Sequence, residues 1–256
     1  MAGVIFAIGL NSWKQMVRDR VFCVVLVAAL LMIGFSYLLA TLTIVESRKI
    51  LLDFGFSAVS MASGMAALYI GIVSMAREIE QRTIYSVVTK PISRSAYLLG
   101  KFLGSAAVVA AAHLLLALNL AGILWLMGES LPAGFASCLF LMLLETWIIL
   151  GLAFLCSSFS SSVLAAGITI ALFLIGRSNS SLLTIAEKGL TPGTRALARF
   201  LYYFTPNLER FNVRDVVAYG RPFPEEMLWT GLAYAAAFVA ACLAASCLFL
   251  GKRDLP

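Results

Sequence analysis

The chain has 256 residues, of which 61% are hydrophobic and only 12% are charged, whereas about 25% of the residues in a typical soluble domain are charged. The charges also leave uncharged stretches long enough to cross a bilayer, which argues against an apolar soluble protein. The net charge is +6, but no compact basic cluster with interleaved aromatic residues occurs. The excess therefore indicates orientation in a membrane rather than nucleic-acid binding.

The first segment, residues 2–20, is amphipathic. Ile8 and Trp13 alternate there with polar residues such as Lys14 and Arg18, a pattern typical of a helix that lies in the membrane interface. A cleaved signal peptide is the competing interpretation. The apolar stretch that follows is too long for one, and no small-residue cleavage site comes after it.

Six apolar segments follow, and a helix needs about 20 apolar residues to cross a bilayer. We predict spans over residues 21–45, 54–76, 102–127, 133–156, 163–176 and 227–250. The fourth and fifth come from one long stretch, which we divide at the serine-rich run 157–162. The fifth span is short, and a broken or re-entrant helix is an alternative for it.

Polar segments separate the spans. Residues 46–53 and 128–132 are short enough to be turns, and residues 77–101 form a longer connector. The segment 177–226 mixes apolar residues with charges and holds four of the seven prolines. This mixture predicts short helices folded onto the outer rim of the bundle.

One stretch of that segment is dense in aromatic and turn-forming residues. It is either an outer gate or a contact for an extracytoplasmic partner, or simply an interfacial aromatic belt. Its members are Tyr202, Tyr203, Pro206, Asn207, Glu209, Phe211 and Asn212.

The positive-inside rule predicts the orientation of the spans. Lysine and arginine gather before the first span, in the connector 77–101 and after the last span. The short loops on the other side carry only Arg48 and Lys49. We therefore expect both termini in the cytoplasm, the segment 177–226 outside it, and residues 1–256 as a single transmembrane domain.

The connector carries the most specific pattern. Its first part can continue the second span as a helix, which Lys90-Pro91 then breaks because proline disfavours α geometry in the preceding residue. Ser93 can cap a new helix that runs into the third span. The resulting helix, turn and helix would present a compact charged surface to a soluble partner.

In this connector the sequence resembles the permease subunits of type 2 ABC exporters. The matching positions are Glu78, Glu80, Thr83, Pro91, Ser93, Arg94, Gly100 and Lys101. Two positions depart from the family pattern, since the usual glycine before the threonine is Arg82 and the usual leucine pair is Val87-Val88.

The resemblance implies an all-α integral membrane protein with six transmembrane helices after an N-terminal interfacial helix, in the bacterial inner membrane. It also implies a dimer, with a second copy or a related permease chain, and a soluble ATP-binding subunit that holds ATP and Mg. That subunit would dock on the interfacial helix and the connector. The implied docking residues are Trp13, Lys14, Arg18, Arg20, Glu78, Glu80, Arg82, Thr83, Pro91, Ser93 and Arg94.

The sequence offers no catalytic or cofactor site of its own. It has no G-x-x-x-x-G-K-[ST] phosphate-binding loop, since Gly100-Lys101 lacks the upstream glycine and is followed by Phe102, so ATP hydrolysis would need a partner chain. The single histidine and five cysteines without C-x-x-C spacing argue against metal binding. We therefore expect a transporter subunit that is not itself an enzyme.

Two ionisable residues fall near mid-membrane, His113 in the third span and Glu145 in the fourth. They either pair to shape a polar substrate path, or each bonds locally to hold helices together. The pair Gly100 and Gly104 has the spacing of close helix packing.

The leading prediction is thus an ATP-driven export permease. The alternative is a membrane assembly or tolerance factor without ATP coupling, and the absence of clustered acids, histidines or a nucleophile motif disfavours an intramembrane enzyme. The substrate is not predicted, since no residue pattern points to one.

Overall fold

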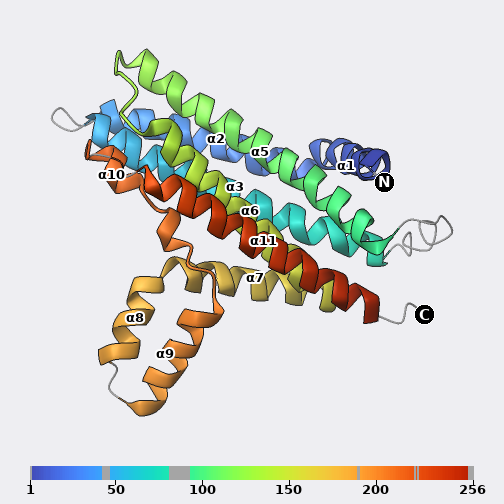
Figure 1. The fold of residues 1–256 in the computed structure, drawn as a ribbon. Helices are drawn as coiled ribbons and strands as arrows, with labels where there is room; N and C mark the ends of the chain where they lie inside the picture. The colour runs from blue at the N-terminus through green and yellow to red at the C-terminus, as the bar shows by residue number, and fades with distance from the viewer. Residues whose placement is uncertain are drawn as a thin grey trace.

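The computed structural model describes residues 2–41, 47–80, 93–188, 191–221, 223 and 225–252, and this part of the chain contains helices but no strands (Figure 1). The helices are α1 (Ala2–Val17), α2 (Arg20–Thr41), α3 (Ser47–Glu80), α5 (Arg94–Leu126), α6 (Phe135–Phe159), α7 (Ser162–Arg177), α8 (Asn179–Lys188), α9 (Pro192–Phe204), α10 (Arg214–Ala218) and α11 (Glu226–Lys252), with a 3-10 turn at Glu209–Phe211.

In the described part, five helices are long and apolar enough to cross a membrane: α2, α3, α5, α6 and α11. Helices α7 and α8 make a sixth candidate only as a pair, which is bent by 72°. Alone, the 16 residues of α7 extend for about 24 Å, less than the roughly 30 Å of hydrocarbon. The predicted all-α fold is confirmed. Five helices of the described part are long enough to span the membrane, and the fifth span predicted from the sequence is the short helix α7, which is followed by the bend into α8.

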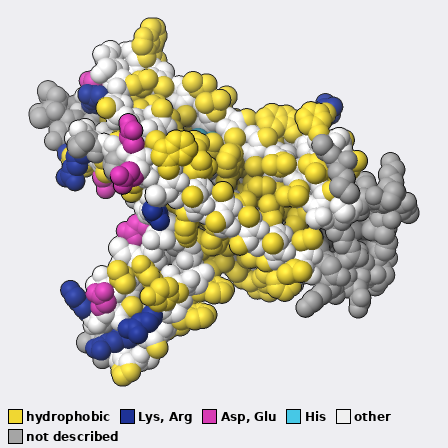
Figure 2. Space-filling model, in the orientation of Figure 1, with side chains coloured by type: hydrophobic (Ala, Val, Ile, Leu, Met, Phe, Trp, Pro, Cys, Tyr) yellow, Lys and Arg dark blue, Asp and Glu magenta, His cyan; other side chains and the backbone are white. Residues whose placement is uncertain are grey.

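Helices α3 and α6 form the centre of the bundle. Helix α3 packs on α2, α5 and α6, while α6 packs on α3, α7 and α11. Much less of α2 and α11 is buried, so these two helices present apolar faces outward. Figure 2 shows these side chains as a broad hydrophobic belt, with the charged ones gathered toward the ends and on a protruding arm. This distribution is what a bilayer requires of a spanning bundle.

The interior of the bundle is apolar and aromatic. The rings of Phe56 and Phe135 pack at 5.4 Å between centroids, and Phe102 meets Phe154 edge-on at 5.5 Å. Figure 1 shows α1, the last turn of α3, the first turn of α5 and the C-terminal turn of α11 at one end of the bundle, called here the α1 end. Helix α10 lies at the opposite end.

The predicted turn at residues 46–53 is wrong from Ser47 onward, where α3 already begins. The side chains of Leu51 and Leu52 are almost fully buried, so packing of these apolar residues stabilises helical turns that the local polar residues did not suggest. The predicted break between the fourth and fifth spans is confirmed, because α6 is capped at Ser160 and α7 begins after Ser161.

The segment before the last span contains the expected short helices, but only part of it covers the bundle. Helix α10 packs on α3 and α6, whereas α8 and α9 pack on each other as a hairpin that projects from the bundle (Figure 1). We call this hairpin, residues 179–204, the arm. In α9, Leu197 and Phe200 are exposed and only Ala198 is buried. The prediction that these helices fold onto the rim is therefore wrong for the arm.

Candidate functional site

Helix α1 lies along the first half of α5, and glycines make their close approach possible. A Cβ at Gly100 would lie 2.8 Å from the carbonyl oxygen of Ile5, and a Cβ at Gly104 would clash with the backbone of Gly9. The predicted glycine packing pair is thus confirmed, and its partner is the interfacial helix. Such backbone contact fixes α1 more rigidly than flexible side chains would.

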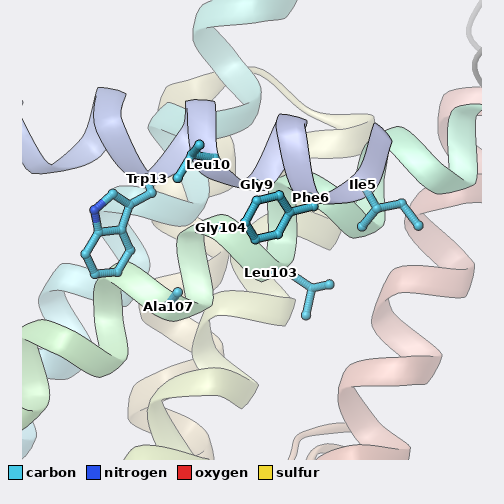
Figure 3. Close-up of a pocket in the computed structure, with 8 residues that line it drawn as sticks. All are labelled: Ile5, Phe6, Gly9, Leu10, Trp13, Leu103, Gly104 and Ala107. Atoms are coloured by element: carbon cyan, nitrogen blue, oxygen red, sulfur yellow. The ribbon is translucent and has the colours of Figure 1, made fainter. Parts of the chain in front are cut away.

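A shallow apolar groove of about 390 Å³ follows this crossing. Figure 3 shows Phe6 and Trp13 of α1 and Leu103 of α5 along it. Trp13 is half-buried in this position, whereas Lys14, Arg18 and Arg20 are exposed. The basic side chains of the first twenty residues are therefore free to meet a partner while the apolar ones hold the helix in place.

The junction between α1 and α2 is fixed by Asp19, which sequence reasoning did not single out. Its Oδ1 accepts hydrogen bonds from the backbone N–H groups of Val21 and Phe22, at 3.0 and 3.2 Å. It also accepts one from the hydroxyl of Tyr69 on α3, at 2.9 Å. The carboxylate caps α2 and ties the junction to the central helix. An aspartate directly before an apolar helix is a readable capping signal.

The connector's two ends agree with the sequence prediction, while its middle lies outside the described residues. Helix α3 continues the second span to Glu80, and Ser93 caps α5 by accepting a hydrogen bond from the N–H of Ala96, at 3.3 Å. Arg82, Thr83 and Pro91 fall in the segment not described, as do the side chains of Glu78, Glu80 and Arg94.

The Gly-Lys pair of the connector motif lies inside the bundle. Lys101 is 2% exposed, and its Nζ donates to the hydroxyl of Tyr97 at 3.4 Å. Beside it, Gly100 contacts α1. These two positions therefore join the interfacial helix to the start of the third span, and they do not form part of a phosphate-binding loop.

The structure does not pair His113 with Glu145. His113 Nε2 donates to the carbonyl oxygen of Leu139 on α6, at 3.0 Å. The Glu145 carboxylate instead accepts hydrogen bonds from Nε and Nη2 of Arg177, at 2.8 and 3.2 Å. Arg177 Nη2 also donates to the hydroxyl of Ser60 on α3. Arg177 ends α7, and sequence reasoning placed it at the start of a loop and did not propose it as a partner.

A second arginine lies outward from this ion pair along the same face of α3. Arg214 of α10 donates from Nη1 to Ser57 at 2.9 Å and from Nε to Asn212 at 2.7 Å. Burial lowers its pKa, and the nearby charge of Arg177 lowers it further, while Glu145 acts in the opposite direction. Guanidinium groups stay charged in proteins. The contacts of Arg214 with Ser57 and of Arg177 with Ser60 therefore form a line of charged and polar groups from the α10 end into the bundle.

The described residues contain no group of three or more His, Cys, Asp or Glu side chains that could hold a metal ion. All five cysteines are free, and three of them, Cys138, Cys156 and Cys242, are buried.

A comparison with known families agrees with this geometry. The family model described as ABC-2 family transporter protein matches residues 6–255, nearly the whole chain. No curated protein matches the sequence. The match includes α1 from residue 6 onward, the connector and all the long apolar helices of the described part. The chain therefore belongs to the ABC-2 family of transporters and is an integral membrane permease subunit of an ABC transporter.

Proposed function

We propose that this permease couples ATP hydrolysis by a separate ATP-binding subunit to export of a substrate from the cytoplasm. The observation that carries the proposal is the α1–α5 crossing at Gly100 and Gly104. It joins the helix that carries Lys14, and that Arg18 directly follows, rigidly to the third span. A push on α1 would therefore move α5 with it.

The α1 end of the bundle is the proposed docking surface. Helix α1, which carries the exposed Lys14, the last turn of α3 and the capped start of α5 all lie at this end. We propose that it faces the cytoplasm of a bacterium with the permease in the inner membrane. The ATP-binding subunit would hold ATP and Mg, and the permease would act as a dimer with a second copy or a related chain.

Co-purification tests this proposal most directly. We expect the wild-type chain, expressed with the ATP-binding subunit of its transporter, to retain that subunit in mild detergent. The double variant Lys14→Glu and Arg18→Glu reverses two exposed charges, one on α1 and one directly after it, and should release the ATP-binding subunit. Arg199→Glu on the arm is the matched control, because it reverses an equally exposed charge at a site far from α1.

Coupling is measured with the same proteins in liposomes. The ATPase rate of the complex should fall to that of the isolated ATP-binding subunit in the α1 double variant, and it should be unchanged in the Arg199→Glu control. A complex that survives charge reversal on α1 with full coupled ATPase activity would reject the docking surface. ATPase stimulation measured across candidate substrates, followed by ATP-driven uptake into inside-out vesicles, tests export and identifies the substrate.

A further inference from the structure

An open hollow of about 350 Å³ lies at the base of the arm, and both polar and apolar side chains line it. Its walls come from three parts of the chain: the first two turns of α8, the last turns of α9, and the return segment that carries the 3-10 turn. Cavities of this size class accommodate small ligands. It lies apart from the α1 end, and the proposed coupling assigns it no role.

The return segment forms a rigid wall of the cavity. The Glu209 carboxylate accepts from the backbone N–H and the hydroxyl of Ser180, at 2.6 and 2.7 Å, and so caps α8. Asn207 donates its N–H to the hydroxyl of Tyr234 on α11, at 2.9 Å. Its Oδ1 accepts the N–H of Arg210, at 3.2 Å. The cavity is therefore preorganised, which lowers the entropy cost of binding a ligand.

Other polar groups of the lining have no partner among the described residues. Asn179 is 3% exposed, and its Oδ1 accepts no hydrogen bond. A buried polar atom of this kind costs free energy unless something else satisfies it. Tyr202 and Arg210 line the same hollow, and a tyrosine hydroxyl and a guanidinium group can both donate to a ligand.

The chemistry of the walls restricts what can bind. The carboxylate of Glu209 and the guanidinium group of Arg210 carry opposite charges, so the lining has no net charge. Glu209 would repel an anion, and Arg210 would repel a cation. Amide, hydroxyl and carboxylate groups together offer both donors and acceptors, which a ligand hydroxyl can match because it is both. The ring of Tyr202 and the side chain of Leu183 add an apolar wall.

We propose that this cavity binds a neutral, polyhydroxylated ligand of the size of one sugar ring. The polar walls take the hydroxyl groups, and the Tyr202 ring covers the apolar face of the sugar. Such a ring comes either as a free sugar or as the headgroup of a glycolipid. Binding needs no ATP, so its outcome is independent of the coupling proposed above.

The test uses the full chain in phosphatidylcholine nanodiscs, extracted without a glycoside detergent, because such a detergent is itself a sugar. In one experiment, saturation-transfer NMR follows glucose and N-acetylglucosamine in solution. In a second experiment, the nanodiscs contain diglucosyl diacylglycerol. We expect saturable binding in at least one of the two experiments. Binding in the first identifies a free sugar as sufficient, and binding in the second alone identifies a lipid-linked sugar as the ligand.

Matched variants show whether the binding uses this cavity. Tyr202→Ala and Arg210→Ala should each weaken binding by about tenfold, the effect of removing a central contact. Phe200→Ala and Arg199→Ala should leave it unchanged, because these side chains border a different hollow on α9. If Tyr202→Ala fails to fold, Tyr202→Phe keeps the ring and removes the hydroxyl, and it should give a smaller loss.

Three results would overturn the proposal. The first is no saturable binding of either sugar form. The second is tighter binding of glucose 6-phosphate or glucosamine than of glucose, because a charged ligand would then be preferred. The third is an equal effect of Tyr202→Ala and Phe200→Ala, because the hollow at the base of the arm would then not be the binding site.

Discussion

The ion pair between Glu145 and Arg177 is a largely buried polar contact inside the bundle. The Glu145 side chain is 3% exposed and that of Arg177 22%, and the contact is bidentate. Removing one member of a buried pair leaves an uncompensated charge, which typically costs on the order of 3 kcal/mol or more. The pair also fixes the end of α7, because Arg177 is its last residue.

Arg177→Ala should therefore lower the thermal unfolding midpoint in mild detergent by about 6 °C or more. Arg199→Ala removes an exposed arginine of the arm and should change the midpoint very little. The charge-swapped double variant Glu145→Arg and Arg177→Glu should recover part of the loss. Equal midpoints for Arg177→Ala and Arg199→Ala would show that the pair does not stabilise the fold.

Asp19 contributes through two separable contacts. Tyr69→Phe removes one hydrogen bond to the carboxylate and should cost about 1 kcal/mol. Asp19→Ala also removes the cap of α2, which is worth about 1 kcal/mol more, so it should lower the unfolding midpoint further. The two variants are compared in the same thermal melt. If Tyr69→Phe were as damaging as Asp19→Ala, the cap would contribute nothing measurable.

At the scale of elements, the seating of α1 on α5 depends on the absence of a side chain at Gly104. Gly104→Ala puts a methyl group against the backbone of Gly9, and overpacking of this kind costs about 1–3 kcal/mol. Helix α1 should then lift from α5, and the coupled ATPase rate should fall. Gly122→Ala on the same helix is the control, because a Cβ there meets nothing within 4 Å.

Cysteine labelling detects the displacement of α1 from α5 without a measurement of ATPase activity. Ser12 lies on the buried face of α1 and is 5% exposed. A Ser12→Cys variant should therefore react slowly with maleimide, in a background where the exposed Cys23 is serine. Adding Gly104→Ala should accelerate that reaction, and adding Gly122→Ala should not. Unchanged reactivity in the Gly104→Ala protein would mean that α1 tolerates the methyl group in place.

Where an element begins or ends by local chemistry, the sequence was sufficient to predict it. The cap at Ser93 and the serine break between α6 and α7 depend on residues within a few positions of the boundary. The glycine pair on α5 was also predictable as a packing surface. Its partner α1 was not, because spacing on one helix does not identify the helix that approaches it.

Features that depend on tertiary contact could not be predicted in this way. The early start of α3 follows from burial of Leu51 and Leu52 against the bundle. Arg177 meets Glu145 because α7 is short and ends beside the middle of α6, and no local pattern at residue 177 indicates that. The middle of the connector, residues 81–92, lies outside the described part, so the docking role of Arg82, Thr83 and Pro91 stays a prediction.

At the scale of the whole molecule, the two ends of the bundle differ in kind. Helix α1 lies at one end of the bundle, whereas the arm leaves the bundle from the far end of α7 (Figure 1). If α7 begins near the α1 end and runs back along α6, α1 and the arm should face opposite sides of the membrane. The positive-inside rule assigns the cytoplasmic side to α1.

Introduced cysteines test this arrangement, again with the exposed Cys23 replaced by serine. Gln15→Cys lies on the exposed face of α1, and Glu187→Cys lies on the exposed surface of the arm. A membrane-impermeant maleimide should label Gln15→Cys only in inside-out vesicles and Glu187→Cys only in intact spheroplasts. Labelling of both from the same side would contradict the proposed topology, and with it the direction of transport, since the ATP-binding subunit can reach only the cytoplasmic face.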